Sequence, residues 1–133
     1  MTTIKITTAL AAAGLISCLA LPGPQASAQP GGMSGQCFYV NQINGLRADG
    51  PRTVYARVGA NTIYRFDLKS DCPDVTSAPE GLVVEPTPSG SICGAMDVDV
   101  SVPSHGTTSR CLVGDIVKLS PEEAASLSSK ARP

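Results

Sequence analysis

Aromatic residues are scarce in this chain, and tryptophan is absent. Among 133 residues there are five aromatic side chains: Phe38, Tyr39, Tyr55, Tyr64 and Phe66. A core with so few rings must be built mainly from Val, Ile and Leu. A domain of this size removes only ~60–65% of its unfolded surface from water, so burial alone gives it little stability. Covalent cross-links are therefore expected to contribute a large share.

An excess of charge of one sign is also missing. Ten Lys and Arg residues stand against eleven Asp and Glu residues, and the two signs are interspersed. This excludes the clustered basic face that binding to nucleic acid requires. Long apolar runs are missing as well, because the longest, Ile6–Leu21, falls short of the ~20 residues that span a bilayer. We expect no nucleic-acid partner and no membrane span.

The N-terminal segment has the three parts of a secretory signal. Lys5 gives a positive start, Ile6–Leu21 is apolar, and Ala26-Ser27-Ala28 is the small-x-small pattern that signal peptidase recognises. Residues 1–28 are predicted to be a signal peptide, cut between Ala28 and Gln29. The mature protein is then expected to be periplasmic or secreted.

A second interpretation of this segment stays open. Leu15-Ile16-Ser17-Cys18 fits a bacterial lipobox, in which Cys18 is acylated and anchors the protein to a membrane. Apolar residues continue past Cys18 and a complete cleavage site follows. We favour the free form over the membrane-anchored lipoprotein.

Four cysteines remain after the signal: Cys37, Cys72, Cys93 and Cys111. In an exported chain they are expected to form two disulfides. Their spacing contains no Cys-x-x-Cys pair, so a zinc site is not expected, and no cofactor is implied. Four cysteines allow three pairings. We prefer the nested arrangement, Cys72–Cys93 with Cys37–Cys111, which ties the first strand to the last.

Glycine and proline interrupt the chain about every ten residues, with β-branched residues between them, which is typical of antiparallel β structure. A flexible Gly-rich leader is expected over residues 29–36 and a single domain over 37–129. Strands are predicted at 38–43, 53–58, 62–68, 82–85, 96–102 and 111–119. Ser120 and Glu123 form a capping box that begins a helix running to about residue 129. The fold class is mainly β, with five or six antiparallel strands in a barrel-like or sandwich sheet and a short C-terminal helix.

Alternation predicts which side chains face the core. In the hairpin 53–68, Tyr64, Phe66 and Leu68 are expected to share one face, and Ile63, Arg65 and Asp67 the other. In 96–102 the inner residues are expected to be Met96, Val98, Val100 and Val102, and the outer ones Asp97, Asp99 and Ser101.

Three polar groupings deserve comparison with catalytic or metal sites. His105, the single histidine, could act as a base beside Ser104 or Asp99, but no nucleophile motif accompanies it. Asp97 and Asp99 share a strand face, whereas paired catalytic carboxylates normally come from different elements. Asp67, Asp71 and Asp74 lack the spacing of a calcium loop. We interpret all three as surface groups and predict no catalytic residue and no metal ligand.

An outward patch of Tyr39, Tyr55 and Arg57 could contact a partner, although a cross-strand pair on a sheet face explains these residues equally well.

Several short motifs, taken in order, resemble a domain-of-unknown-function family of small exported bacterial proteins. They are Cys37 with Ile43, Tyr64-Arg65-Phe66-x-Leu68-x-x-x-Cys72-Pro73, Ile92-Cys93, Cys111-x-Val113-x-x-Ile116 and Leu119-Ser120-Pro121-Glu122-Glu123. The resemblance implies export, a compact β-rich domain and four structural cysteines. It implies no activity.

The sequence therefore predicts a non-enzymatic binding or envelope-associated module whose partner is a protein or an envelope component. An alternative is an inhibitor that presents the loop 103–109 to a periplasmic or extracellular hydrolase. A weak hydrolase that uses Asp97 and Asp99 is a third hypothesis.

Overall fold

A computed structural model describes residues 36–78 and 81–133. The predicted signal peptide with its Ala28–Gln29 cleavage site, the alternative lipidation site Cys18, and the leader up to residue 35 lie outside the described residues. Within the described part of the chain, no helix is long and apolar enough to cross a membrane.

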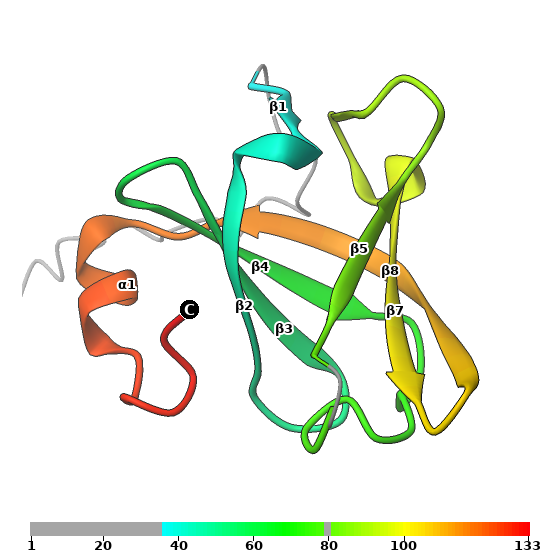
Figure 1. Cartoon of the computed structure of the whole chain (residues 1–133). Helices are drawn as coiled ribbons and strands as arrows, with labels where there is room; N and C mark the ends of the chain where they lie inside the picture. The colour runs from blue at the N-terminus through cyan, green and yellow to red at the C-terminus, as the bar shows by residue number, and fades with distance from the viewer. Residues whose placement is uncertain (1–35, 79–80) are drawn as a thin grey trace, which may run out of the picture.

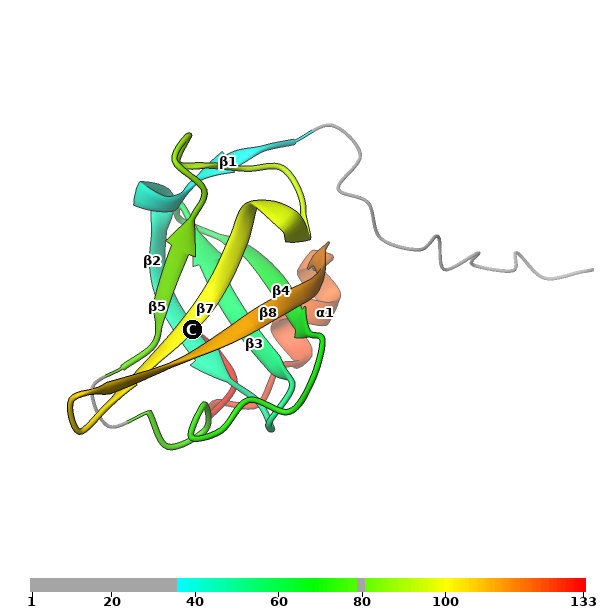
Figure 2. The ribbon, with the colours of Figure 1, turned by 90° about the vertical axis from the view of Figure 1, so that its right-hand side faces the viewer.

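The main element is a six-stranded antiparallel sheet that curls into a half-barrel (Figure 1), which confirms the predicted fold class. The strand order is β2-β3-β4-β8-β7-β5. The strands are β2 (Ile43–Ala48), β3 (Thr53–Val58), β4 (Thr62–Leu68), β5 (Val83–Pro86), β7 (Val98–Ser104) and β8 (Thr107–Lys118). The edge strands β2 and β5 lie on the same side of the half-barrel without pairing (Figure 2).

The predicted hairpin β3–β4 forms with the expected bounds and faces. Val54 pairs with Phe66 and Ala56 with Tyr64, and all four side chains are buried. Strict alternation leaves only one register that puts these apolar residues on one face, so this hairpin is specified locally.

The core fills the concave side of the sheet. Its largest fully buried side chains are Phe66, Ile92, Ile116, Val54, Val100, Val102 and Val113. The loop after β4 covers one end through Cys72 and Val75. The other end is covered by a two-stranded sheet of β1 (Phe38–Tyr39) and β6 (Ser91–Ile92), where Phe38 stacks on Tyr64.

Two predicted strands are broken by 3-10 turns. The first prediction, 38–43, is replaced by β1, the turn η1 (Val40–Gln42) and β2. The strand predicted at 96–102 begins only at Val98, because the turn η2 (Ala95–Asp97) precedes it. Met96 was therefore placed wrongly, and its side chain is 83% exposed.

The predicted loop 103–109 is also wrong, because strands β7 and β8 continue through it. Ser104 pairs with Thr107, which leaves a two-residue turn of His105 and Gly106. Both residues have positive φ, 49° and 81°, as a tight turn that matches the twist of a hairpin requires. Strand β8 accordingly begins four residues before the predicted Cys111.

The four cysteines in the described part of the chain form two disulfides, as predicted, but the preferred pairing is wrong. Cys37 bonds to Cys93, and Cys72 bonds to Cys111. The reason lies in the sheet: β1 pairs with β6, which brings Cys37 beside Cys93, while the loop after β4 folds back over β8. Local spacing carries no information on either contact.

The C-terminal helix α1 (Pro121–Ser126) begins at the predicted capping box. The Glu123 amide donates to Ser120 Oγ, and the Ser120 amide donates to the Glu123 carboxylate. Helix α1 ends at Ser126, before the predicted residue 129, and Ala131 and Pro133 in the tail that follows it are buried. Gly45 makes room for this tail, since a Cβ there would lie 3.1 Å from the Pro133 carboxyl carbon.

Candidate functional site

The carboxylates proposed as a catalytic pair have separate partners. Asp97 accepts hydrogen bonds from the amides of Cys93 and Gly94, at 2.9 and 3.0 Å, and thereby closes the turn η2. Asp99 accepts from Arg110 through both Nε and Nη2, at 2.8 and 2.7 Å. Asp97 also lies outside the strand, so the two groups do not share a strand face as predicted.

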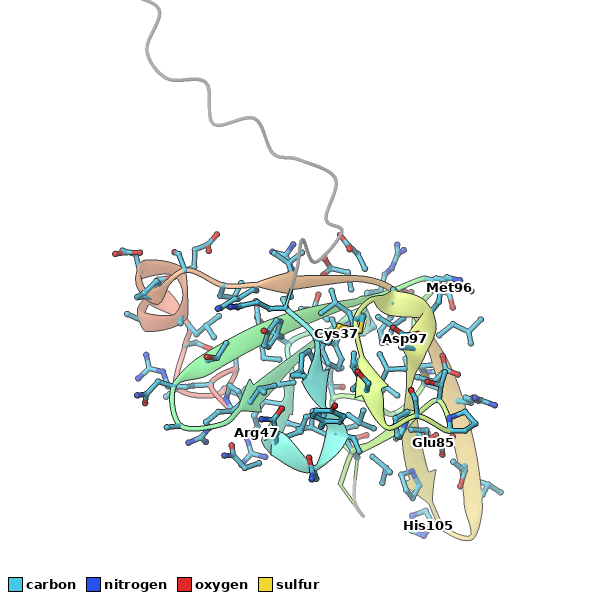
Figure 3. All side chains as sticks on the ribbon, turned by 90° about the horizontal axis from the view of Figure 1, so that it is seen from above. Cys37, Arg47, Glu85, Met96, Asp97 and His105 are labelled. Atoms are coloured by element: carbon cyan, nitrogen blue, oxygen red, sulfur yellow. A yellow bond between two sulfur atoms is a disulfide. The ribbon has the colours of Figure 1, made fainter. Side chains whose placement is uncertain are left out.

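His105 is exposed at the tip of the hairpin β7–β8, and Figure 3 shows it far from Asp97. The neighbouring Ser104 uses its carbonyl oxygen to accept a hydrogen bond from Thr107 Oγ1, at 2.8 Å. This arrangement is that of a turn.

The three aspartates around Cys72 serve different parts of the surface. Asp67 pairs with Arg65 at 3.1 Å, and Asp71 with Arg52 at 3.8 Å. Asp74 has a positive φ and its carbonyl oxygen accepts from the amides of Ser77 and Ala78. In the described ranges no group of three or more His, Cys, Asp or Glu side chains could hold a metal ion.

The residues of the expected outward patch lie on different elements. Tyr39 is 57% exposed on β1, whereas Tyr55 and Arg57 are half-buried on β3. Burial raises the pKa of Tyr55, and the nearby charge of Asp49 adds to this. The buried Nε of Arg57 has no hydrogen-bond partner among the described residues. Tyr39, Tyr55 and Arg57 therefore do not form one exposed patch.

Strand β2 has no strand partner along one edge within the described residues. It pairs with β3 on one side and with no other strand in residues 36–78 and 81–133. Residues of an antiparallel strand alternately bond to the partner strand and point their groups away from it. The Asp49 amide donates to the Thr53 carbonyl oxygen at 2.9 Å, which sets this alternation. Leu46 and Ala48 therefore direct their N–H and C=O groups away from β3.

A groove runs along this edge, with a cavity volume of about 350 Å³. We call it the β2-edge groove. Its described lining residues are Leu46, Arg47, Ala48, Val75, Thr76, Ser77, Ala78, Gly81, Leu82, Ser129 and Lys130. The described residues of the opposite wall are 75–78, Gly81 and Leu82, which precede β5 in the chain.

The described lining residues of the β2-edge groove carry charge of one sign. Arg47 and Lys130 are both exposed, and no acidic side chain is among the described lining residues. Arg47 lies on the outer face of β2, because its neighbours Leu46 and Ala48 pack against the core. The groove therefore combines apolar side chains on its inner side with two cations.

A second hollow, of about 420 Å³, lies at the end covered by β1 and includes Tyr64 and Lys118. Its polar groups are largely used within the protein: Lys118 Nζ donates to Gln36 Oε1 at 3.0 Å, and Gln42 accepts from the Tyr39 amide at 2.8 Å. The β2 edge, in contrast, carries backbone groups with no strand partner. We therefore regard the β2-edge groove as the better candidate.

Sequence reasoning missed this site because it ended the first strand at residue 43. A bulge between Ile43 and Gly45 lets β2 continue instead, and Asn44 Nδ2 donates to the Gly59 carbonyl oxygen at 2.7 Å. The alternation of Leu46, Arg47 and Ala48 was the available signal.

Residues 1–133 match the model of a family of unknown function (DUF6491). Neither a curated protein nor a solved structure matches the chain. Because the family model covers the whole chain, the protein belongs to this family of unknown function.

Proposed function

We propose that the protein is an exported, non-enzymatic binding module that recognises its partner at the β2-edge groove. The observation that carries this proposal is an edge strand whose Leu46 and Ala48 backbone groups border a groove of about 350 Å³. Unpaired strand edges are templates for pairing with another chain. Among the described residues no second strand pairs with this edge.

Export is supported by the signal-like N-terminal pattern and by the two disulfides, which are compatible with an extracellular or periplasmic location. Intact-mass analysis of the protein from its source cells tests this part. A mature chain that begins at Gln29 is expected. A lipid-modified chain that begins at Cys18 would favour the membrane-anchored form, and an uncut chain with reduced thiols would contradict export.

Binding is tested by capture from cell-envelope extract with the oxidised mature chain and two variants at one position. Ala48→Pro removes an N–H that points away from β3, so it spares the β2–β3 hydrogen bonds. Ala48→Val is the matched control, because it adds a similar volume and keeps the N–H. A specific partner should be retained by the wild type and by Ala48→Val, and lost with Ala48→Pro. Equal retention by all three would contradict the proposed site.

A second candidate function, inhibition of a hydrolase, is favoured by the projecting tip of the hairpin β7–β8 (Figure 3), where residues 105–108 are exposed. Thr108→Arg changes this tip without touching the groove. If the retained partner is a hydrolase and Thr108→Arg abolishes its inhibition while Ala48→Pro does not, the inhibitor function replaces the proposed one.

A further inference from the structure

We propose that the β2-edge groove binds an extended peptide segment that adds a strand to β2 and carries an acidic side chain between two apolar ones. This inference rests on the proposed binding function and names the chemistry of its partner. Three observations carry it: the backbone of the edge, the side chains along it and the charge beside it.

The backbone of β2 fixes the mode of binding. Leu46 and Ala48 offer two N–H and two C=O groups to a chain that lies alongside, with the spacing of a β ladder. One of these groups is already engaged, since Arg47 Nη1 donates to the Leu46 carbonyl oxygen at 3.2 Å. That bond is exposed to solvent, so an incoming peptide N–H can compete for the same carbonyl oxygen.

The side chains along the groove fix the pattern of the peptide. Successive residues of an added strand point to opposite faces of the sheet. Alternate side chains of the bound peptide would face inward. They are expected to be apolar, because they would lie against Leu46, Ala48, Val75 and Leu82. The residue between them would face outward, beside Arg47. The segment that fits is apolar–x–apolar, in which x lies on the cationic side.

The charge beside the groove fixes the middle residue. Arg47 and Lys130 both line the groove, and among its described lining residues there is no carboxylate to neutralise them. A glutamate or aspartate at the middle position would lie against Arg47, and a guanidinium and a carboxylate form strong, directional hydrogen bonds. A basic residue there would be repelled. The partner is therefore a protein with an exposed apolar–acidic–apolar segment.

The test uses two blocked pentapeptides, acetyl-Thr-Val-Glu-Val-Thr-amide and its Lys counterpart, with the isotope-labelled mature chain. With the Glu peptide we expect saturable shifts of the Leu46 and Ala48 amide signals and slower hydrogen exchange at both. Binding should be on the order of 100 µM and at least about 5-fold tighter than for the Lys peptide.

Charge reversal at the edge gives a matched control. Arg47→Glu should invert the preference between the two peptides, whereas Lys69→Glu, an exposed lysine outside the groove, should change it less than about 2-fold. Equal affinity for the two peptides would overturn the acidic specificity. Shifts that map elsewhere, or that follow protein concentration without peptide, would overturn strand addition in favour of another site or a second copy.

The outcome also separates this inference from the function on which it rests. Absence of shifts with either peptide at about 1 mM would overturn the peptide partner. If Ala48→Pro still abolished capture from envelope extract, the proposed binding function would hold, but its partner would have a different chemistry. If neither peptide caused shifts and envelope capture did not depend on residue 48, both the peptide partner and the proposed binding function would be contradicted.

Discussion

The guanidinium of Arg47 donates a hydrogen bond from Nη1 to the carbonyl oxygen of its own neighbour, Leu46, at 3.2 Å. This contact places a cation over the acceptor that β2 presents at its free edge. Charged side chains on an edge strand discourage pairing between copies of the same chain, because two such edges bring like charges together. We therefore expect Arg47 to discourage pairing of this edge with a second copy of the chain.

Replacing Arg47 by Thr tests this role. The variant keeps a residue suited to strands but loses the charge, so self-association should increase at high protein concentration in sedimentation experiments. The free energy of unfolding should change by no more than about 0.5 kcal/mol, because the side chain is exposed. Lys69→Thr removes the same charge away from the edge and should stay monomeric. Identical behaviour of the two variants would show that Arg47 does not guard the edge.

The two disulfides should differ in accessibility and in their effect on stability. They close loops of similar entropic weight, since sequence separations of 56 and 39 enter only as logarithms. Cys37 and Cys93 are exposed, whereas Cys72 and Cys111 are 4% and 7% exposed. Under mild reduction of the native protein, mass spectrometry after alkylation should find Cys37 and Cys93 labelled first.

Removal of each disulfide as a pair of alanines should cost about 2–5 kcal/mol of unfolding free energy. The Cys72–Cys111 pair should cost about 1 kcal/mol more, because its deletion also leaves a cavity in the core. Urea denaturation of the two double variants measures this difference. A larger loss for Cys37–Cys93 would mean that the cover formed by β1 and β6 contributes more than the buried cross-link.

Local pattern was enough to predict the hairpin β3–β4 and the helix cap. In the hairpin, alternation from Val54 to Leu68 admits one register. At the cap, Ser120 and Glu123 are three residues apart and satisfy each other's amides. Both features depend on residues close together in the chain, so the local sequence is sufficient to predict them.

The failures have a different origin. Met96 has the right periodicity for a strand, but Asp97 accepts two amide hydrogen bonds from Cys93 and Gly94 and holds the chain in a turn. An Asp side chain that bonds to nearby backbone amides favours a turn over a strand, and a prediction from alternation alone does not include this effect.

The disulfide pairing and the groove could not be derived from local pattern, because both arise from contacts between distant segments. Cys37 reaches Cys93 only because β1 pairs with β6. The groove lies along β2, which is one end of the strand order and pairs with β3 alone among the described residues. A sequence that predicts each strand correctly still leaves open which strands become edges.

The capping box gives a prediction about pH. The hydrogen bonds from the Ser120 amide and side chain lower the pKa of Glu123 from its usual 4.5. A carboxyl with a lowered pKa in the folded state stabilises it above the unfolded pKa, and this contribution is lost as pH falls through the folded pKa. The Ser120 amide signal should therefore titrate with a midpoint below 4.5.

Glu123→Gln provides the control for this titration, because glutamine keeps the acceptor and loses the charge. Its Ser120 amide signal should be flat over the same range. A midpoint at or above 4.5 in the wild type would contradict the cap hydrogen bond as the cause.

Tyr64 should make the protein less stable in alkaline solution. Its ring is 4% exposed and stacks on Phe38 with centroids 4.6 Å apart, and burial raises the pKa of its hydroxyl from 10.0. In the unfolded chain the hydroxyl therefore loses its proton at lower pH than in the folded one. The stabilisation is complete below about pH 10 and is lost as pH rises through the folded pKa.

Tyr64→Phe keeps the stacked ring and removes the titrating group. The unfolding free energy of the wild type, measured by urea denaturation at several pH values, should fall more steeply above about pH 10 than that of Tyr64→Phe. Tyr55→Phe should flatten the profile separately, since the pKa of Tyr55 is raised as well and its side chain lies on the outer face of β3, away from the core. Parallel profiles for wild type and Tyr64→Phe would mean that the Tyr64 hydroxyl reaches water in the folded protein, and that the cover formed by β1 and β6 opens in solution.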